Sequence, residues 1–384
     1  MTTTINNEHK KLNVPNLRFP EFQGEWEKTK FGDIATGFDY GMNAAAKNYD
    51  GENKYIRITD IDEASSTYTD KDIVSPDGIL TDNYLVNNRD ILLARTGAST
   101  GKSYLYKKTD GKLYFAGFLI RANVTTHDPY FVFSQLHTHR YWRWVSIMSA
   151  RSGQPGINSQ EYSSFPIYIT SIEEENKIAK LLSLLDERIA TQNKIIDKLQ
   201  SLIKGIRNEV FGKLRKNIGF NAVVGDVLDY EQPQSYIVEN TEYTNEGTPV
   251  LTANKAFVLG YTLETDGIYD KGDCIIFDDF TLDCKYVDFP FKVKSSAIKI
   301  LTTKNKELLR YTFEFLKYLD LSTEEHKRHY IAETQNQEFI MPTEQMVKTI
   351  AHIFSTLSLR METALKQRDV FEKQKQYLLR QMFI

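Results

Sequence analysis

Two stretches of this chain share one pattern of apolar and polar positions. Residues Ile172–Phe211 and Glu344–Phe383 align without a gap at an offset of 172 residues. In the first stretch, apolar side chains recur by alternating steps of four and three, which is the spacing of a continuous stripe along one helix. We therefore predict two long helices built from a duplicated sequence.

The stripe on each predicted helix forms a seam that needs a partner, because a slender helix cannot bury such a stripe alone. We expect the two helices to pair with one another, and the second to be the less regular partner, since Arg368 and Lys375 interrupt its seam. In the first helix, Gln192 is the polar member of the seam. The apolar seam positions are Ile178, Leu182, Leu185, Ile189, Ile196, Leu199, Ile203 and Ile206 in the first helix and Ile350, Phe354, Leu357, Met361, Phe371 and Leu378 in the second.

A strand-rich block precedes each predicted helix. Short runs of β-branched and aromatic residues alternate there with Gly, Asp and Asn turns. The expected strands are Lys54–Ile61, Asp90–Arg95, Lys102–Tyr106 and Leu113–Arg121 in the first block and Thr248–Ala253, Gly272–Phe277, Asp283–Phe291 and Ser296–Leu301 in the second. Helices are expected at Pro129–Ser149 and Lys306–Asp320, so the order of elements repeats as well.

The chain is thus predicted to be an α+β protein with a pseudo-two-fold internal repeat, in which two strand-rich domains alternate with two long helices. The expected boundaries are an N-terminal arm at 1–21, blocks at 22–165 and 217–341, and helices at 166–216 and 342–384.

Composition agrees with a folded intracellular protein. The 41% hydrophobic content is ample for real cores, and no apolar run is long enough for a signal peptide or a membrane span, so we expect a cytoplasmic protein that does not associate with membranes. Cys274 and Cys284 have no neighbouring ligands and are expected to be reduced structural residues. The net charge is only −3, but ten basic and three acidic residues fall between Arg89 and Arg151, which predicts a basic face.

The sequence does not match any of three enzyme motifs well enough to predict a catalytic site. Thr96–Ser103 resembles a phosphate-binding loop, but it lacks the first glycine and is followed by a strand pattern where a helix is required. Asp278, Asp283 and Lys285 resemble a nuclease cluster, but they lie too close together along one turn. The glycine-rich loop and the Pro-Pro-aromatic motif that adenine methylation would require are both absent.

Three sequence strings in combination resemble the specificity subunit of type I restriction–modification systems. They are PNLRFPEFQGEW at Pro15–Trp26, ILLARTGASTGK at Ile91–Lys102 and GINSQEYSSFPIYI at Gly156–Ile169. The second half has no counterpart of GINSQEY, so the second recognition domain is assigned mainly by its position.

The resemblance implies two target-recognition domains held apart by helices that pack as an antiparallel coiled coil. It implies that the chain reads a split target on double-stranded DNA, has no catalytic activity and binds no cofactor of its own. The expected partners are two modification subunits and, for cleavage, restriction subunits, with S-adenosylmethionine, ATP and Mg²⁺ on those partners. Two alternatives stay open: a helical scaffold with two protein-binding domains, and a stand-alone nuclease or nucleotide hydrolase.

Candidate DNA contacts follow from the polar loops, because side-chain forks and amides read bases while lysines on phosphates fix register. Each candidate has a structural alternative; Arg95, for example, could serve in an ion pair. In the first block the candidates are Arg95, Ser99, Thr100, Lys102, Arg151, Gln154 and Asn158. In the second block they are Lys255, Thr281 and Lys285, with Lys292, Lys294 and Lys299 as phosphate contacts.

Overall fold

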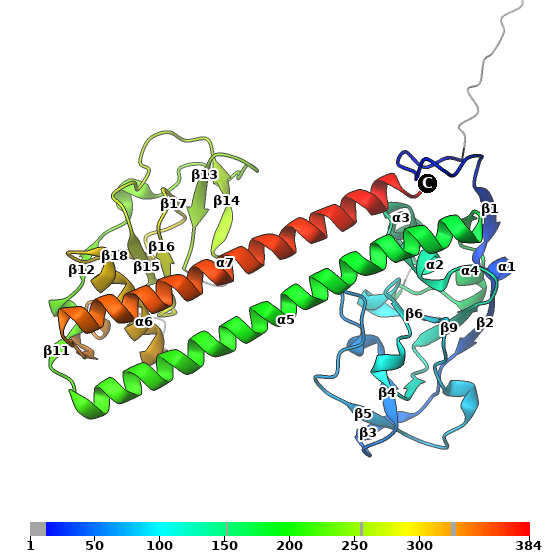
Figure 1. Ribbon diagram of the computed structural model, residues 1–384, viewed down its shortest axis with the longest axis horizontal. Helices are drawn as coiled ribbons and strands as arrows, with labels where there is room; N and C mark the ends of the chain where they lie inside the picture. The colour runs from blue at the N-terminus through cyan, green and yellow to red at the C-terminus, as the bar shows by residue number, and fades with distance from the viewer. Residues whose placement is uncertain (1–12, 151–152, 254–255, 324–327) are drawn as a thin grey trace, which may run out of the picture. The chain divides into compact units, whose positions relative to one another are not determined.

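The computed structural model describes residues 13–150, 153–253, 256–323 and 328–384. The chain divides into two compact units, one formed by Met1–Thr191 with Arg368–Ile384 and the other by Gln192–Gln367. Each unit contains one strand-rich block and one end of each of the two long helices (Figure 1). This arrangement confirms the predicted α+β class.

The two long helices are α5, Ile172–Asn217, and α7, Glu344–Gln381. Glu173–Glu175 lie in the first turn of α5, and Arg215 and Lys216 lie in its last turn. Charges in these places complement the helix dipole. Despite the two cations in its seam, α7 runs without a break, so the interruption changes the composition of the seam rather than the continuity of the helix.

Within each unit the helix ends pack antiparallel. In the first unit, Asp186 of α5 forms an ion pair of 2.6 Å with Lys375 of α7, and the residues at the start of α5 share a core with those at the end of α7. In the second unit, Gln192 donates a hydrogen bond of 3.1 Å to the carbonyl of Ala364. All fourteen predicted apolar seam positions are buried or partly buried.

The first unit is built on a four-stranded antiparallel sheet in the order β2-β9-β6-β7. One face of β6 packs Ile91 and Leu93 against Phe131 of the helical layer, and the opposite face buries Leu92 and Ala94 in a second cluster. The strands of this unit are β1 (Glu27–Lys30), β2 (Ala35–Tyr40), β3 (Ala45–Asn48), β4 (Lys54–Ile56), β5 (Val74–Asp77), β6 (Asp90–Ala94), β7 (Ser103–Leu105), β8 (Leu113–Phe115), β9 (Leu119–Val124) and β10 (Pro166–Ile169). Its short helices are α1 (Phe31–Ile34), α2 (Pro129–Gln135), α3 (His139–Met148) and α4 (Ser159–Ser163).

The second unit repeats this topology. Its four-stranded sheet has the order β12-β18-β15-β16, and α6 (Lys306–Leu319) packs on it as the helical layer does in the first unit. The strands are β11 (Ala222–Val223), β12 (Asp229–Glu231), β13 (Thr248–Leu251), β14 (Val258–Thr262), β15 (Cys274–Asp278), β16 (Cys284–Val287), β17 (Lys292–Val293), β18 (Ile298–Thr302) and β19 (Glu338–Phe339). Each unit also has one small parallel pair, β4 with β8 and β13 with β17, so the predicted internal repeat extends to the fold of the blocks.

Each block is closed by a pair of antiparallel strands where the chain enters and leaves it. β1 pairs with β10 in the first unit, and β11 pairs with β19 in the second. The expected border after residue 165 is therefore corrected, because β10 lies beyond it and belongs to the first block.

Three expected elements differ from the structure for local reasons. The helix expected at Pro129–Ser149 is two helices, because α2 ends at Gln135 and Thr138 caps α3 by accepting a hydrogen bond from the Tyr141 N–H. The strand expected at Lys54–Ile61 ends at Ile56, because the Asp60 carboxylate binds the Arg57 backbone N–H and forms a tight turn. The strand expected at Leu113–Arg121 is split into β8 and β9 by a turn.

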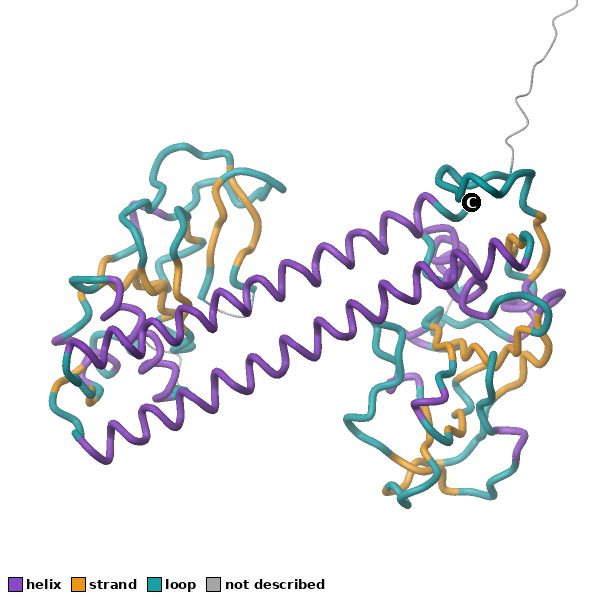
Figure 2. The backbone as a smooth tube through the Cα atoms, viewed as in Figure 1, coloured by secondary structure: helices purple, strands orange, loops and turns teal. Residues whose placement is uncertain are grey.

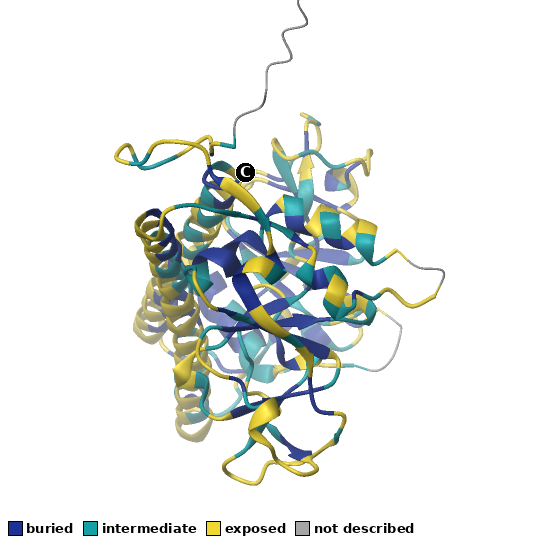
Figure 3. Cartoon of the chain, turned by 90° about the vertical axis from the view of Figure 1, so that its right-hand side faces the viewer, coloured by how far each residue is buried: buried dark blue, intermediate teal, exposed yellow. Residues whose placement is uncertain are grey.

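The core of the first unit is rich in aromatic rings contributed by distant parts of the chain. Trp26 lies 5.4 Å from Phe131 and 6.0 Å from Phe383, measured between ring centroids. Buried positions gather along the strands and the helices that cover them (Figure 3), and loops connect the short strands in both blocks (Figure 2). The last residues of the chain are thus part of the core of the first block.

Candidate nucleic-acid interface

Arg95 follows β6 directly and is held in place from two sides. Its guanidinium lies 4.6 Å from the centroid of the Tyr40 ring, and Nη1 donates a hydrogen bond of 3.4 Å to the Gly117 carbonyl. The Tyr40 hydroxyl accepts a hydrogen bond of 3.3 Å from the Ser159 N–H. The pKa of Tyr40 is lowered chiefly by hydrogen bonding with the Ser159 side chain and further by this backbone bond. Within the described residues the guanidinium forms no ion pair, which does not support the ion-pair alternative.

The loop after Arg95 is clamped by its backbone. The Tyr162 hydroxyl accepts a hydrogen bond of 3.2 Å from the Gly101 N–H, and the Tyr141 hydroxyl donates one of 2.8 Å to the Gly101 carbonyl. Gly101 has a φ of +94°, and a Cβ there would lie 2.8 Å from Val145, so only glycine fits. The loop then enters β7, so the segment after Ser103 is a strand, as the pattern predicted.

A second loop lies beside the first. The Gly97 N–H donates to the Pro155 carbonyl at 3.0 Å, and the Ile157 N–H donates to the Arg95 carbonyl at 2.9 Å. The exposed Gln154 amide lies over Gly97, so the structure brings Arg95 and Gln154 to one surface.

Other candidates of the first block have structural duties. The Thr100 hydroxyl donates to the Gly97 carbonyl at 2.8 Å, and Thr100 is buried. Asn158 caps α4 by accepting a hydrogen bond of 2.9 Å from the Glu161 N–H. Lys102 forms an ion pair of 3.1 Å with Glu63, and Ser99 is partly buried. The structure thus corrects the expectation that Thr100 lies on the surface, while Asn158 is engaged in a cap.

On the other side of Arg95 lies a hollow of about 610 Å³. Its lining includes Tyr40, Asn43, Thr59 and Phe118 besides Arg95. The sequence analysis named none of these four residues, although the glycines of the strings GFDYGMN and FAGF were a signal for tight turns next to Tyr40 and Phe118.

Candidates of the second block are dispersed. Thr281 is exposed in the turn between β15 and β16, Lys285 is partly buried on β16, and Lys294 is exposed after β17. The candidates Arg151 and Lys255 lie outside the described residues.

The structure corrects the expectation that Lys292 and Lys299 contact phosphates, because both side chains lie in the interior. Lys292 is 3% exposed and pairs with Glu264 at 2.7 Å, and Lys299 is 1% exposed and pairs with Asp279 at 3.5 Å. Both ammonium groups are occupied by protein oxygen atoms, so neither lysine is available to a phosphate.

Replacing Lys299 with Ala is expected to lower the free energy of unfolding by about 3 to 5 kcal/mol, because the Asp279 carboxylate would stay buried without its cation. Chemical denaturation at neutral pH measures this loss. The matched control is Lys294→Ala, an exposed lysine whose removal should change stability by less than about 0.5 kcal/mol. Equal effects of the two substitutions would contradict the assignment.

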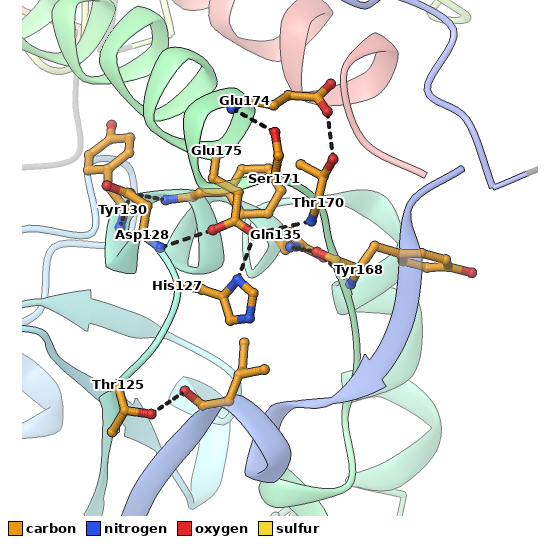
Figure 4. Close-up of polar contacts among 12 residues, drawn as sticks. Thr125, His127, Asp128, Tyr130, Gln135, Tyr168, Thr170, Ser171, Glu174 and Glu175 are labelled. Carbon is orange, nitrogen blue, oxygen red and sulfur yellow. Dashed lines mark hydrogen bonds and ion pairs between the residues drawn. The ribbon is translucent and has the colours of Figure 1, made fainter. Parts of the chain in front are cut away.

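A network of buried carboxylates fastens the first block to the start of α5 (Figure 4). Glu174 is fully buried and receives two hydrogen bonds of 2.7 Å from Arg18 of the N-terminal arm. Glu175 is also fully buried and accepts hydrogen bonds from the Asp128 N–H at 3.0 Å and the Thr170 N–H at 3.2 Å. Because these bonds are specific in direction, the network fixes the orientation of the block on its helix.

His127 completes this network through a contact of 2.9 Å between its Nδ1 and Glu175. Burial raises the pKa of Glu175. Beside the network, Gln135 and Tyr168 exchange two hydrogen bonds, of 2.7 Å and 3.0 Å, which tie α2 to β10.

His137 gives the first unit a defined response to acid. Its Nδ1 lies 2.9 Å from the Phe133 carbonyl, its Nε2 lies 3.0 Å from the Ser66 hydroxyl, and burial together with Lys375 lowers its pKa to about 4. In the unfolded chain a histidine titrates near pH 6.5, so the unfolded state binds the extra proton between pH 6.5 and 4. Stability is therefore lost as the pH falls through this window.

Replacing His137 with Gln should remove this loss. Between pH 7 and pH 4.5 the natural chain is expected to lose about 2 to 3 kcal/mol more than the variant, as measured by urea denaturation at the two pH values. His139→Gln, at an exposed position on the next helix, is the control. If the natural chain and the His137 variant lose stability equally, the assignment of a neutral His137 in the folded chain is refuted.

The described ranges hold neither a cluster suited to a metal ion nor a helix suited to cross a membrane. No group of three or more histidine, cysteine, aspartate or glutamate side chains there is placed to hold a metal ion. Nor does any described helix combine the length and the apolar character needed to span a bilayer. Cys274 and Cys284 are buried free thiols whose pKa values burial raises to about 12 and about 11, so they are poor nucleophiles.

Comparison with known proteins gives consistent similarities. Residues 23–201 match the family described as type I restriction modification DNA specificity domain. The chain is 45% identical over 126 residues, 31% of each chain, to the type I restriction enzyme EcoR124I/EcoR124II specificity subunit of Escherichia coli. It is 27% identical over 198 residues, 51% of this chain and 44% of the relative, to the type I restriction enzyme MjaVIII specificity subunit of Methanocaldococcus jannaschii. The chain thus spans less than half the length of these two curated relatives.

The fold is also found in a solved structure. The crystal structure of a type I restriction-modification system S subunit from M. genitalium superimposes with a TM-score of 0.69 at 15% identity, covering 97% of this chain and 99% of that chain. At this identity the likeness establishes the fold alone.

Proposed function

We propose that this chain, whose residues 23–201 belong to the type I restriction modification DNA specificity domain family, is the DNA-reading subunit of a type I restriction–modification complex. The observation that carries the proposal is the repeat itself. Two blocks of the same topology, with different side chains, are each fastened to one end of each of two helices of duplicated sequence. Helices of repeated sequence that carry two blocks with different side chains suit a protein that reads two different short DNA sequences.

The two blocks would read two separated segments of double-stranded DNA, and the helices would set the length of the gap. α5 contains 46 residues, so at 1.5 Å per residue it is about 69 Å long. Two helices that pack along a heptad seam would hold the two blocks apart as a spacer. Base identity would be read by side chains of the loops, and cations on phosphates would fix the register.

Chemistry would come from partners. Two modification subunits would bind S-adenosylmethionine and methylate adenine at N6 after extruding the base, and restriction subunits with ATP and Mg²⁺ would cleave. This chain would direct these subunits to the target and would carry out no reaction itself.

The test is methylation sequencing of DNA from cells that express this chain with a matching modification subunit, compared with cells that express the modification subunit alone. We expect an N6-methyladenine motif in two separated halves that depends on this chain. If the two proteins co-purify but no dependent motif appears, and the purified chain has no salt-dependent affinity for duplex DNA, the proposal fails and the protein-binding scaffold is favoured.

A further inference from the structure

The hollow beside Arg95 has chemistry suited to a base edge. Asn43 and Thr59 are exposed at its mouth and bring an amide and a hydroxyl, while Arg95 brings a guanidinium free of ion pairs with described residues. Phe118 is 58% exposed and Tyr40 is 42% exposed, so two aromatic rings border the same opening.

Phe118 is held outward by a rigid turn. The Met42 N–H donates to the Phe115 carbonyl at 2.8 Å, and the Gly117 N–H donates to the Met42 carbonyl at 2.8 Å. A Cβ on Gly41 would lie 2.2 Å from the Ala116 carbonyl oxygen, so the two segments approach as closely as only glycine allows. Phe118 is one of several large apolar side chains exposed in the described residues, and it differs in bordering the same hollow as Tyr40 and Arg95.

The second block keeps the frame of this site and changes its side chains. The Arg95 N–H donates to the Phe118 carbonyl at 3.0 Å, and the Asp279 N–H donates to the Ala297 carbonyl at 2.8 Å at the equivalent place in the repeated sheet. Arg95 thus corresponds to Asp279, which is buried beside Lys299, and Phe118 corresponds to the small Ala297. The same backbone presents a cation and an aromatic ring in one block and neither in the other.

We propose that the hollow of the first block receives the edge of a guanine in one half of the DNA target, with Arg95 as the hydrogen-bond donor and Phe118 packed against the neighbouring base. Arginine is the side chain whose fork of N–H groups matches O6 and N7 of guanine in the major groove. The Tyr40 ring and the Gly117 carbonyl orient the guanidinium before DNA arrives, so little side-chain freedom is lost on binding. This inference rests on the proposed function and specifies the residues that read one half of the target.

The experiment uses the complex of the full chain with its modification subunit. The motif methylated by the natural complex is determined first, and fluorescence anisotropy then measures binding to a duplex that carries it and to a duplex of unrelated sequence. Arg95→Ala and Phe118→Ala are expected to weaken binding to the cognate duplex by roughly 10- to 100-fold, with little change for the unrelated one. The methylated motif should lose its preference at a guanine of one half, and the other half and the gap should stay unchanged.

The matched control is Arg143→Ala, which removes an exposed cation of α3 that does not line the hollow and should leave the motif unchanged. Arg95→Lys keeps the charge without the fork, so it should relax the guanine preference even if the alanine variant folds poorly. An unchanged motif in Arg95→Lys and Phe118→Ala would overturn the inference, and so would an equal loss of affinity for both duplexes, which would indicate a phosphate contact. If the natural complex gives no motif dependent on this chain, the proposed function itself fails.

Discussion

A chimera in which Glu27–Ile169 are replaced by the equivalent block of a relative is expected to methylate a new motif that differs in one half only. The reason lies in how the block is connected. β1 and β10 pair antiparallel, with Glu27 opposite Ile169, so the chain enters and leaves the block at adjacent points. Exchange at these two points leaves both helices of the spacer intact.

The donor block must keep the contacts that fasten it to α5. His127 and Asp128 lie inside the exchanged segment and bind Glu175, so a donor with the same two residues should dock in the same orientation. Methylation sequencing measures the outcome, and the exchange of β11–β19 is the reciprocal control that should alter the opposite half. A motif that stays the same, or that changes in both halves, would contradict two independent reading domains.

Lengthening both helices by one heptad is expected to widen the gap of the target by about three base pairs and to leave both halves unchanged. Seven residues add about 10.5 Å of helix, and a base pair occupies about 3.4 Å of duplex. A heptad preserves the seam, because the apolar stripe repeats every seven residues. The insertions belong after Thr191 in α5 and after Gln367 in α7, where the chain passes between the two units.

The efficiency of methylation should fall at the same time, because three base pairs also turn one half of the target around the duplex axis. An insertion in α5 alone is the control: it shifts its seam against that of α7 and should abolish methylation. If the double insertion left the gap unchanged, the helices would not be the element that sets it.

The sequence predicted the burial of side chains that follow a local periodicity, and it failed for side chains whose burial depends on a residue far away in the sequence. The seam of Ile178, Leu182 and Leu185 could be read directly, because each helix repeats its own burial pattern. The burial of Lys299 could not be predicted in this way. A lysine in the apolar strand string AIKIL is expected to be exposed, and only the folded chain brings it next to the buried carboxylate of Asp279, twenty residues earlier.

The candidate interface followed the same rule. Arg95 was singled out from its polar loop, but Tyr40 at the end of β2 and Phe118 in the turn before β9 come next to it only in the folded domain. Thr100 and Asn158 were chosen for their polar side chains, but both side chains form hydrogen bonds with nearby backbone groups. Threonine and asparagine often form such local bonds, which compete with ligand contacts.

The aromatic core shared by Trp26, Phe131 and Phe383 has a consequence for synthesis of the chain. At about 5 to 20 residues per second, a ribosome needs roughly 10 to 35 s to make residues 192–367 after the first block has emerged. Throughout that interval the first block lacks the end of α7, so the rings of Trp26 and Phe131 cannot pack against Phe383. The newly made chain therefore passes through a period in which chaperone capture competes with folding, and that period ends only when the last residues arrive.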